Sequence, residues 1–95
     1  MTLEFHMQQG SIQERIVSYV RDQILKMYNK DRRISRAEIY FRERPLGNLQ
    51  YKLCEIDLSI LGGSMFIQRR ADTFEQAAKE VVEALTRKID DRIKA

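Results

Sequence analysis

The residue types that carry enzyme chemistry are sparse in this sequence of 95 residues. It contains one histidine, His6, and one cysteine, Cys54, and these two side chains are too few for a zinc site. Alternating polarity predicts that His6 lies on the outer face of a strand as a solvated residue, and that Cys54 lies on an inner face as a small hydrophobe. Asp90 and Asp91 are neighbours on a predicted helix and point in different directions, unlike a paired acid and base. The sequence thus predicts no enzyme, metal site, cofactor or small-molecule substrate.

Phosphate binding is the chemistry that the remaining residue types allow. Gly62 and Gly63 lie between two predicted strands, whereas a glycine loop that cradles phosphate leads into a helix. The 17 basic and 14 acidic side chains give a net charge of +3, and the basic excess lies mainly in residues 11–33. A basic helix face is typical of nucleic-acid binding, but the same charges also solvate the outer face of an ordinary amphipathic helix. Spacing alone leaves both interpretations open.

Two stretches show helical periodicity. Apolar residues at three- or four-residue intervals predict a helix over residues 12–30, and Ser11 followed by Glu14 forms a capping-box pattern at its start. A second stripe predicts a helix in the last part of the chain, and its buried side is expected to hold Phe74, Ala78, Val81, Leu85 and Ile89. Two residues before this second helix are suitable caps, namely Asp72 and Thr73.

Period-two alternation predicts strands at residues 3–7, 36–44, 51–61 and 64–71. Gly62 and Gly63 are expected to form a two-residue hairpin loop in which both adopt positive φ angles. That loop places Glu55 opposite Arg70 on the outer face, so these two charges are expected to pair across the strands. Arg69 falls on the inner face near the end of its strand, where its head reaches water.

The predicted element order is β-α-β-β-β-α in one domain of residues 1–95. The strand-helix-strand unit implies parallel pairing with a right-handed crossover, and the two later connections are hairpins. Each helix has one apolar stripe and each strand has one apolar face. Both helices are therefore expected to cover one face of a four-stranded sheet, in an α+β two-layer sandwich. The other face is expected to be polar except for Tyr40, Leu53 and Phe66.

The sequence also bears on the compartment of the protein. No apolar stretch approaches the roughly 20 residues of a membrane span. The first ten residues lack the basic and apolar regions of a signal peptide, and a single cysteine makes no internal disulfide. These features favour the cytoplasm and predict no membrane partner.

The chain resembles the ribosome hibernation-promoting factor family in its element order, its two-glycine hairpin and the passage "EIDLSILGGSMFIQRRADTFEQAAKEVVEALTRKI", residues 55–89. This family includes ribosome-associated inhibitor A, and its members were often called sigma-54 modulation proteins. The resemblance covers nearly the whole chain and is to the short form, without a C-terminal dimerisation domain. It implies a fold akin to a double-stranded-RNA-binding domain. It also implies a stress-response translation inhibitor that binds 16S rRNA of the small ribosomal subunit at the decoding region and, in many members, accompanies the pairing of ribosomes.

The resemblance implies RNA contacts from basic residues of both helices and of nearby strand ends. Lys26 and Arg87 match commonly basic positions of the family, and Arg69 and Arg70 match a commonly basic region. The expected RNA-binding residues are Lys26, Lys30, Arg32, Arg33, Arg69, Arg70, Arg87, Lys88 and Arg92. Other positions that are often basic in the family carry Asp22, Gln23, Ala84 and Asp91. The scaffold is thus kept better than the charge that would face RNA.

A second hypothesis is a protein-interaction module, a homodimer or an adaptor, on the same fold with weakened RNA binding. In that case the exposed edge of the first or last strand, or the outer face of the sheet, would pair with another chain. The two hypotheses differ in whether phosphate or protein is the partner.

Overall fold

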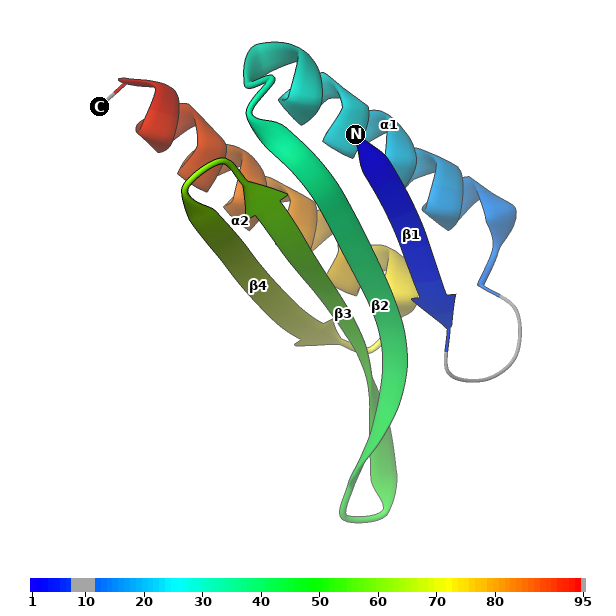
Figure 1. Cartoon of the computed structure of the whole chain (residues 1–95). Coiled ribbons are helices and arrows are strands. Elements are labelled where there is room, and N and C mark those ends of the chain that lie inside the picture. Colours follow the sequence, from blue (N-terminus) through cyan, green and yellow to red (C-terminus); the bar gives the residue numbers. More distant parts are fainter. Residues whose placement is uncertain (8–11, 95) are drawn as a thin grey trace.

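The computed structural model describes residues 1–7 and 12–94, and its elements follow the predicted order (Figure 1). These elements are β1 (Thr2–Met7), α1 (Glu14–Lys30), β2 (Ile34–Leu46), β3 (Leu49–Ile60), β4 (Gly63–Ala71) and α2 (Phe74–Lys94). The strands form one sheet in the order β1-β2-β3-β4, in which β1 runs parallel to β2 and the other pairs are antiparallel. The predicted α+β fold is confirmed.

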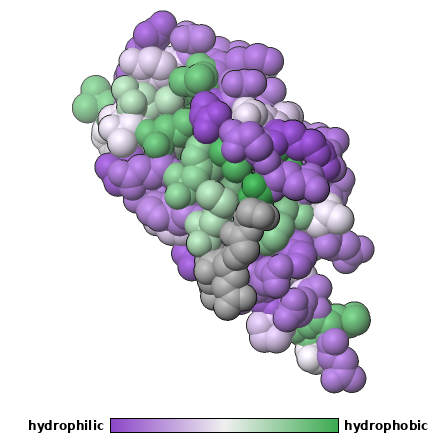
Figure 2. Space-filling model, turned by 90° about the vertical axis from the view of Figure 1, so that its right-hand side faces the viewer, coloured by the Kyte–Doolittle hydropathy of each residue, from purple (hydrophilic) through white to green (hydrophobic). Residues whose placement is uncertain are grey.

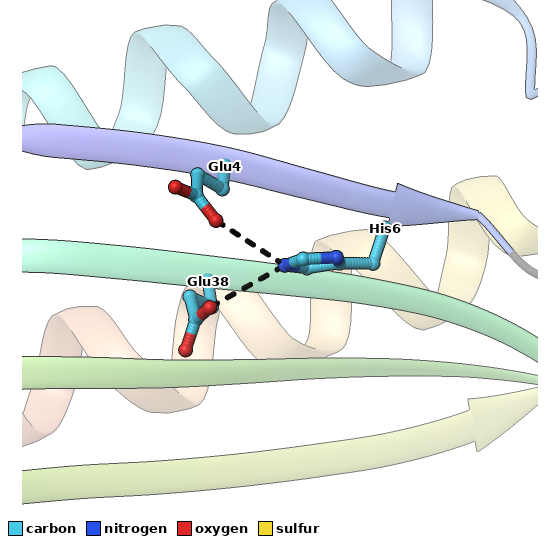
Figure 3. A group of neighbouring side chains, drawn as sticks. All are labelled: Glu4, His6 and Glu38. Carbon is cyan, nitrogen blue, oxygen red and sulfur yellow. Dashed lines mark ion pairs between the residues drawn. The ribbon is translucent and has the colours of Figure 1, made fainter.

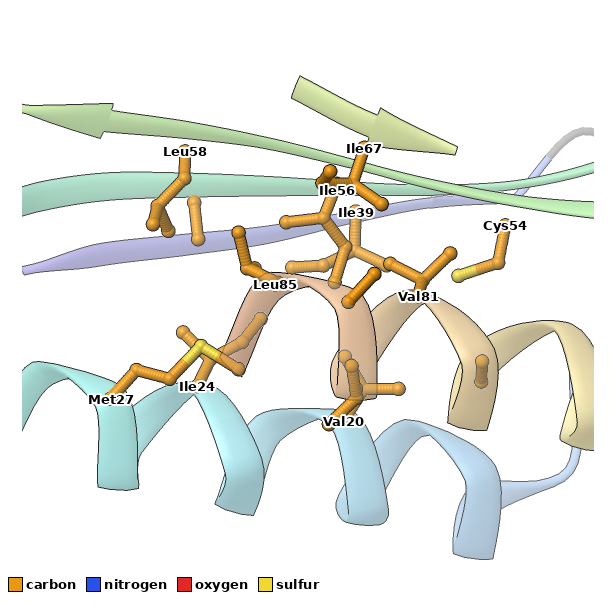
Figure 4. Close-up of a cluster of buried hydrophobic side chains, with 14 of the residues drawn as sticks. Val20, Ile24, Met27, Ile39, Cys54, Ile56, Leu58, Ile67, Val81 and Leu85 are labelled. Atoms are coloured by element: carbon orange, nitrogen blue, oxygen red, sulfur yellow. The ribbon is translucent and has the colours of Figure 1, made fainter. Parts of the chain in front are cut away.

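Both helices cover the same face of the sheet, so the molecule has two layers (Figure 1). Figure 4 shows apolar side chains of the two helices meeting those of the strands between the layers. The fully buried members of this core include Val20 and Ile24 from α1, Val81 and Leu85 from α2, and Ile39, Ile56 and Leu58 from the sheet. The periodic stripes of the sequence therefore form the core, as predicted. Neither helix is long and apolar enough to cross a membrane.

Cys54 belongs to this core. Its side chain is fully buried on the inner face of β3, and burial raises the pKa of its thiol to about 12. A thiol in this state is a small hydrophobe and not a nucleophile, in agreement with the prediction.

The turn between β3 and β4 lies one residue earlier than predicted, which shifts the pairing register of the two strands by two residues. The loop consists of Leu61 and Gly62, and Gly63 already pairs with Ile60 as the first residue of β4. Only Gly62 has a positive φ, of 90°, as at the third position of a type II turn, so the expectation of two such glycines is wrong. A shift of two residues keeps every side chain on its predicted face, because alternation along a strand has a period of two.

The start of α1 also differs from the prediction. The helix begins at Glu14, and Gln13 occupies the N-cap position without a capping hydrogen bond from its side chain. The predicted capping box from Ser11 is therefore wrong, and Ser11 itself lies outside the described residues. In α2 the expected cap is present, because Thr73 Oγ1 accepts a hydrogen bond from the backbone N–H of Gln76 at 3.1 Å.

The β2–β3 hairpin projects beyond the rest of the sheet (Figure 1). β1 pairs with β2 only as far as Phe41, and β4 pairs with β3 only from Lys52 onward. The hairpin between these points is a two-stranded ribbon, and Leu46 and Leu49 at its tip are 55% and 72% exposed. Figure 2 shows this projection with hydrophobic residues at its end.

Candidate nucleic-acid interface

The C-terminal ends of α1 and α2 lie at the same end of the molecule, next to the β3–β4 turn (Figure 1). Residues 26–33 and 87–94, which form these helix ends, contain eight basic and three acidic side chains. Cations at the C-terminus of a helix also interact favourably with the helix dipole. We call this region the basic end, and it brings together seven predicted RNA-binding residues, namely Lys26, Lys30, Arg32, Arg33, Arg87, Lys88 and Arg92.

Three of these seven side chains are held by acids of the basic end. Asp31 is buried and accepts hydrogen bonds from Arg33 Nε at 2.8 Å and Arg33 Nη2 at 2.9 Å. Arg92 Nε lies 3.9 Å from the same carboxylate, and Arg92 Nη2 donates to the backbone carbonyl of Leu61 at 3.3 Å. Arg33 and Arg92 thus join the end of α1 to the β3–β4 turn and to α2, which is a structural role.

Ion pairs also link the two helices directly. Lys30 Nζ lies 3.3 Å from Asp90 Oδ1, so the ammonium group of Lys30 is partly neutralised. At the other end of the helix pair, Arg15 donates two hydrogen bonds to Glu75 at 2.8 and 3.2 Å. These pairs bridge the two helices and leave fewer uncompensated positive charges on the helical surface.

The other four of these seven side chains are exposed and make no ion pair with an acid in the described part of the chain. Arg32 donates to the side chain of Asn29 at 3.2 Å, and its guanidinium lies 4.6 Å from the centre of the Tyr28 ring. Both contacts leave its charge uncompensated. The predicted RNA-binding residues of the basic end that are available to an anionic partner are therefore Lys26, Arg32, Arg87 and Lys88.

Arg69 and Arg70 lie apart from the basic end. They are close to the end of β4 that leads into the start of α2, whereas the basic end contains the other terminus of α2. The predicted pairing of Arg70 with Glu55 is wrong, because the observed register places Arg70 opposite Leu53 and Glu55 opposite Gln68. Glu55 instead lies 3.5 Å from Arg42.

The four departures from the family pattern have different structural settings. Ala84 is buried in the core, so the lack of a basic residue at this position removes no charge from the surface. Asp22 and Asp91 are exposed on their helices, and Gln23 is half-buried. The two exposed acids lower the positive potential of the helical surface.

His6 is on the outer face of β1, as predicted, but it is not simply solvated. Its ring stacks on Tyr40 with 4.6 Å between centres, and its Nε2 lies 3.4 Å from Glu38 and 3.7 Å from Glu4 (Figure 3). The ligand atoms of these three residues lie within 4.8 Å of one another, which would suit a cation. Arg36, however, lies 3.0 Å from Glu4 and 3.2 Å from Glu38, on the same two oxygens that face His6. A guanidinium already supplies the positive charge, so the group is an ion-pair network.

Sequence reasoning missed the pairing of arginines with tyrosines on the outer face of the sheet. Arg42 lies over the ring of Tyr40 at 4.7 Å, and Arg70 lies over the ring of Tyr51 at 5.1 Å. The pair of Tyr40 and Arg42 could have been predicted, because residues two apart on one strand point to the same face. The second depends on the register between β3 and β4, which the sequence did not reveal.

Comparison with known proteins identifies the family. The sequence profile described as "Sigma 54 modulation protein / S30EA ribosomal protein" matches residues 3–94. A search of curated protein sequences finds no match. Among solved structures, a ribosomal subunit interface protein from Coxiella burnetii is similar with a TM-score of 0.80 and 14% identity, over 100% of both chains. The N-terminal domain of Thermus thermophilus Protein Y has a TM-score of 0.73 and 15% identity, over 94% of this chain and 96% of that one. The chain therefore belongs to the sigma 54 modulation protein / S30EA ribosomal protein family, the family of hibernation-promoting factors that its sequence resembles.

Proposed function

We propose that this protein is a ribosome-associated factor that binds the small ribosomal subunit through phosphates of 16S rRNA. The observation that carries the proposal is that, in a chain of this family, four predicted RNA-binding residues at the basic end are exposed and make no ion pair with a described acid. These residues are Lys26, Arg32, Arg87 and Lys88. The name of the Coxiella burnetii neighbour, a ribosomal subunit interface protein, supports the same partner.

The proposed site on the ribosome is the decoding region. A protein seated there excludes tRNA and mRNA, and it inhibits translation by occupancy without a chemical step. Contacts to phosphates fix the position of a protein on RNA but carry no direct sequence information. We therefore expect the protein to act as a hibernation factor in the cytoplasm, where the ribosomes are, and to need no cofactor.

Co-sedimentation with 30S subunits and 70S ribosomes through sucrose tests this proposal. Pelleting should be saturable and should weaken as salt rises, because each phosphate contact releases condensed counterions. Four phosphate contacts correspond to a slope of about −3 in a plot of log K against log salt concentration. An absence of pelleting at low salt would refute ribosome association.

A charge-reversed variant locates the surface. Lys26→Glu with Arg87→Glu should abolish pelleting and stay folded, because both side chains are exposed and make no ion pair with the described acids. The matched control is Arg21→Glu with Lys79→Glu, which changes the net charge equally at helix positions outside the basic end. Equal loss in both variants would mean that binding follows overall charge and not this surface.

A protein-interaction module remains the second candidate, favoured by the exposed leucines at the hairpin tip and by Phe66 on the edge strand β4, which is 52% exposed. Contacts through these residues would produce a homodimer or a complex with another protein. Light scattering after size exclusion tests the homodimer. A monomer at high concentration would rule it out.

A further inference from the structure

We infer that the outer face of the sheet carries a second RNA site, which binds single-stranded RNA by base stacking. This site lies on the face that the helices leave open, and it does not depend on the ribosome contact proposed for the basic end. It is centred on a hollow of about 380 Å³, which we call the outer-face hollow, lined by Tyr51, Leu53, Gln68, Arg69 and Arg70.

The residues that line the outer-face hollow offer the groups that bind a nucleotide. Its floor is Leu53, which is only 9% exposed although it lies on the outer face. The Tyr51 ring provides a flat aromatic surface, and the Arg70 guanidinium 5.1 Å from its centre adds a second planar group. The amide of Gln68 offers both donors and an acceptor to the edge of a base. This combination suits a base inserted beside a phosphate.

The charge at the hollow favours a phosphate. Arg69 and Arg70 are exposed, and no ion pair with an acid is found for either within residues 1–7 and 12–94. Arg69 Nη1 donates to the carbonyl of Gln68 at 2.8 Å, which leaves its other N–H groups for a ligand. The acid that faces Gln68 in the register, Glu55, is ion-paired with Arg42. The guanidinium of Arg70, which makes no ion pair with a described acid, therefore borders the aromatic ring of the hollow, and Arg69 also lines the hollow.

A second hollow extends the site across the sheet. It has a volume of about 300 Å³ and is lined by His6, Met7, Tyr40, Phe41 and Arg42. The Tyr40 ring stacks with His6 at 4.6 Å between centres, and the Arg42 guanidinium lies 4.7 Å from its centre. Arg42, Leu53 and Arg70 stand in one row across β2, β3 and β4, so the row joins the two hollows.

The form of this surface favours single-stranded RNA over a duplex. Exposed sheet faces that bind RNA stack two or three splayed bases on aromatic side chains, and base stacking tolerates different sequences. The bases of a duplex are already stacked and paired, so they cannot enter separate hollows. An acidic protein segment would use the arginines but would leave the aromatic surface and the amide without a role.

Fluorescence anisotropy of the full chain with labelled RNA tests the site. The probes are single strands of uridine and of adenosine, each about ten nucleotides long, and a duplex of about 16 base pairs. We expect salt-sensitive binding of both single strands and weaker binding of the duplex. A wild-type protein that binds no single strand at low salt, or prefers the duplex, would overturn the inference.

Two variants at Tyr51 separate stacking from folding. Tyr51→Leu keeps apolar bulk but removes the ring, and it should weaken single-strand binding about 5- to 150-fold. Tyr51→Phe keeps the ring and should bind as the wild type does. Thermal melting followed by circular dichroism confirms that both variants are folded. Equal affinity of the leucine and phenylalanine variants would overturn the stacking contact.

Two further variants separate the two RNA sites. Arg70→Gln should weaken single-strand binding and reduce the slope against log salt by about 0.7, the value for one lost phosphate contact on a single strand. Lys26→Gln with Arg87→Gln should leave single-strand binding unchanged, even if it abolishes ribosome pelleting. The opposite pattern would assign the single strand to the basic end. Loss of pelleting in Tyr51→Leu, with no single-strand binding by the wild type, would make the outer face part of the ribosome contact and overturn the inference.

Discussion

Asp31 and Arg33 are two residues apart, and the side chain of Arg33 folds back onto the carboxylate of Asp31. Two guanidinium nitrogens donate at 2.8 and 2.9 Å, and the backbone N–H of Arg33 donates at 3.1 Å. The Asp31 side chain is 3% exposed, while that of Arg33 is 48% exposed. Asp31 also ends α1, because its N–H donates to Met27 O at 2.9 Å. Asp31 therefore contacts the helix end through its backbone, and the start of β2 and Arg92 of α2 through its carboxylate.

Replacement of Asp31 by asparagine should destabilise the protein. The amide is isosteric but uncharged, and it cannot accept two charge-assisted hydrogen bonds from Arg33. We expect a lower melting temperature for Asp31→Asn, measured by circular dichroism at neutral pH. Asp22→Asn is the matched control, since Asp22 is exposed and makes no ion pair with the residues described. Equal melting temperatures for the two variants would contradict the role of Asp31.

The contribution of Asp31 should also depend on pH. Hydrogen bonding from Arg33 lowers the pKa of this carboxyl in the folded protein. A carboxyl with a lowered folded pKa stabilises the protein fully above its unfolded pKa, which is about 3.9, and loses this contribution as pH falls through the folded pKa. The difference in melting temperature between wild type and Asp31→Asn should thus be constant from about pH 5 upward and should shrink below pH 4. A difference that persists at the lowest pH would contradict the charge argument.

The ion pairs within the basic end lead to a prediction about ribosome binding. Lys26 makes no ion pair with a described acid, so Lys26→Gln should weaken binding and reduce the salt slope by about 1. Lys30 is paired with Asp90, so the double variant Lys30→Gln with Asp90→Asn removes a pair without a change in net charge. This double variant should pellet with ribosomes as the wild type does. A loss comparable to that of Lys26→Gln would show that Lys30 contacts RNA.

Burial of Cys54 predicts slow reaction with thiol reagents. The pKa of about 12 and the full burial keep the native thiol neutral and inaccessible, so native protein at pH 8 should react far more slowly than protein unfolded in denaturant. In the core, Cys54→Ser should be less stable than Cys54→Ala by about 1–3 kcal/mol, because serine buries a hydroxyl without a partner. Denaturant unfolding measures this difference. Rapid native labelling would contradict the observed burial.

Most of the fold could be predicted from sequence because periodicity is a local signal. The stripes of α2 and the alternation of β3 each lie within one segment, and the structure places their apolar residues in the core. The end of the first helix near Lys30 was predicted from the charged residues that follow it. The start of that helix was not, because the Ser11 and Glu14 pattern is short and the structure uses Gln13 as N-cap.

The candidate site was less predictable because its charges depend on tertiary neighbours. The resemblance implied that Lys30, Arg33 and Arg92 contact RNA, but each lies near an acid. The packing of the elements brings Asp90 to Lys30 and Asp31 to Arg92, whereas Arg33 folds back onto Asp31 two residues before it. Register posed a similar problem. A shift of two residues left the core faces unchanged, yet it moved Arg70 from Glu55 to Leu53 and so placed Arg70 over Tyr51.

The two glycines of the β3–β4 turn offer a direct test of this register. Gly62 has a φ of 90°, so Gly62→Ala forces a left-handed backbone on alanine and should cost about 1–2 kcal/mol. Gly63 has no such φ, and a Cβ there meets no atom within 4 Å. Gly63→Ala should therefore be neutral, or stabilise the protein by up to about 1 kcal/mol because alanine lowers the conformational entropy of the unfolded chain. Denaturant unfolding of both variants gives the comparison. A loop formed by both glycines would make both substitutions costly, whereas the observed register makes only the first one costly.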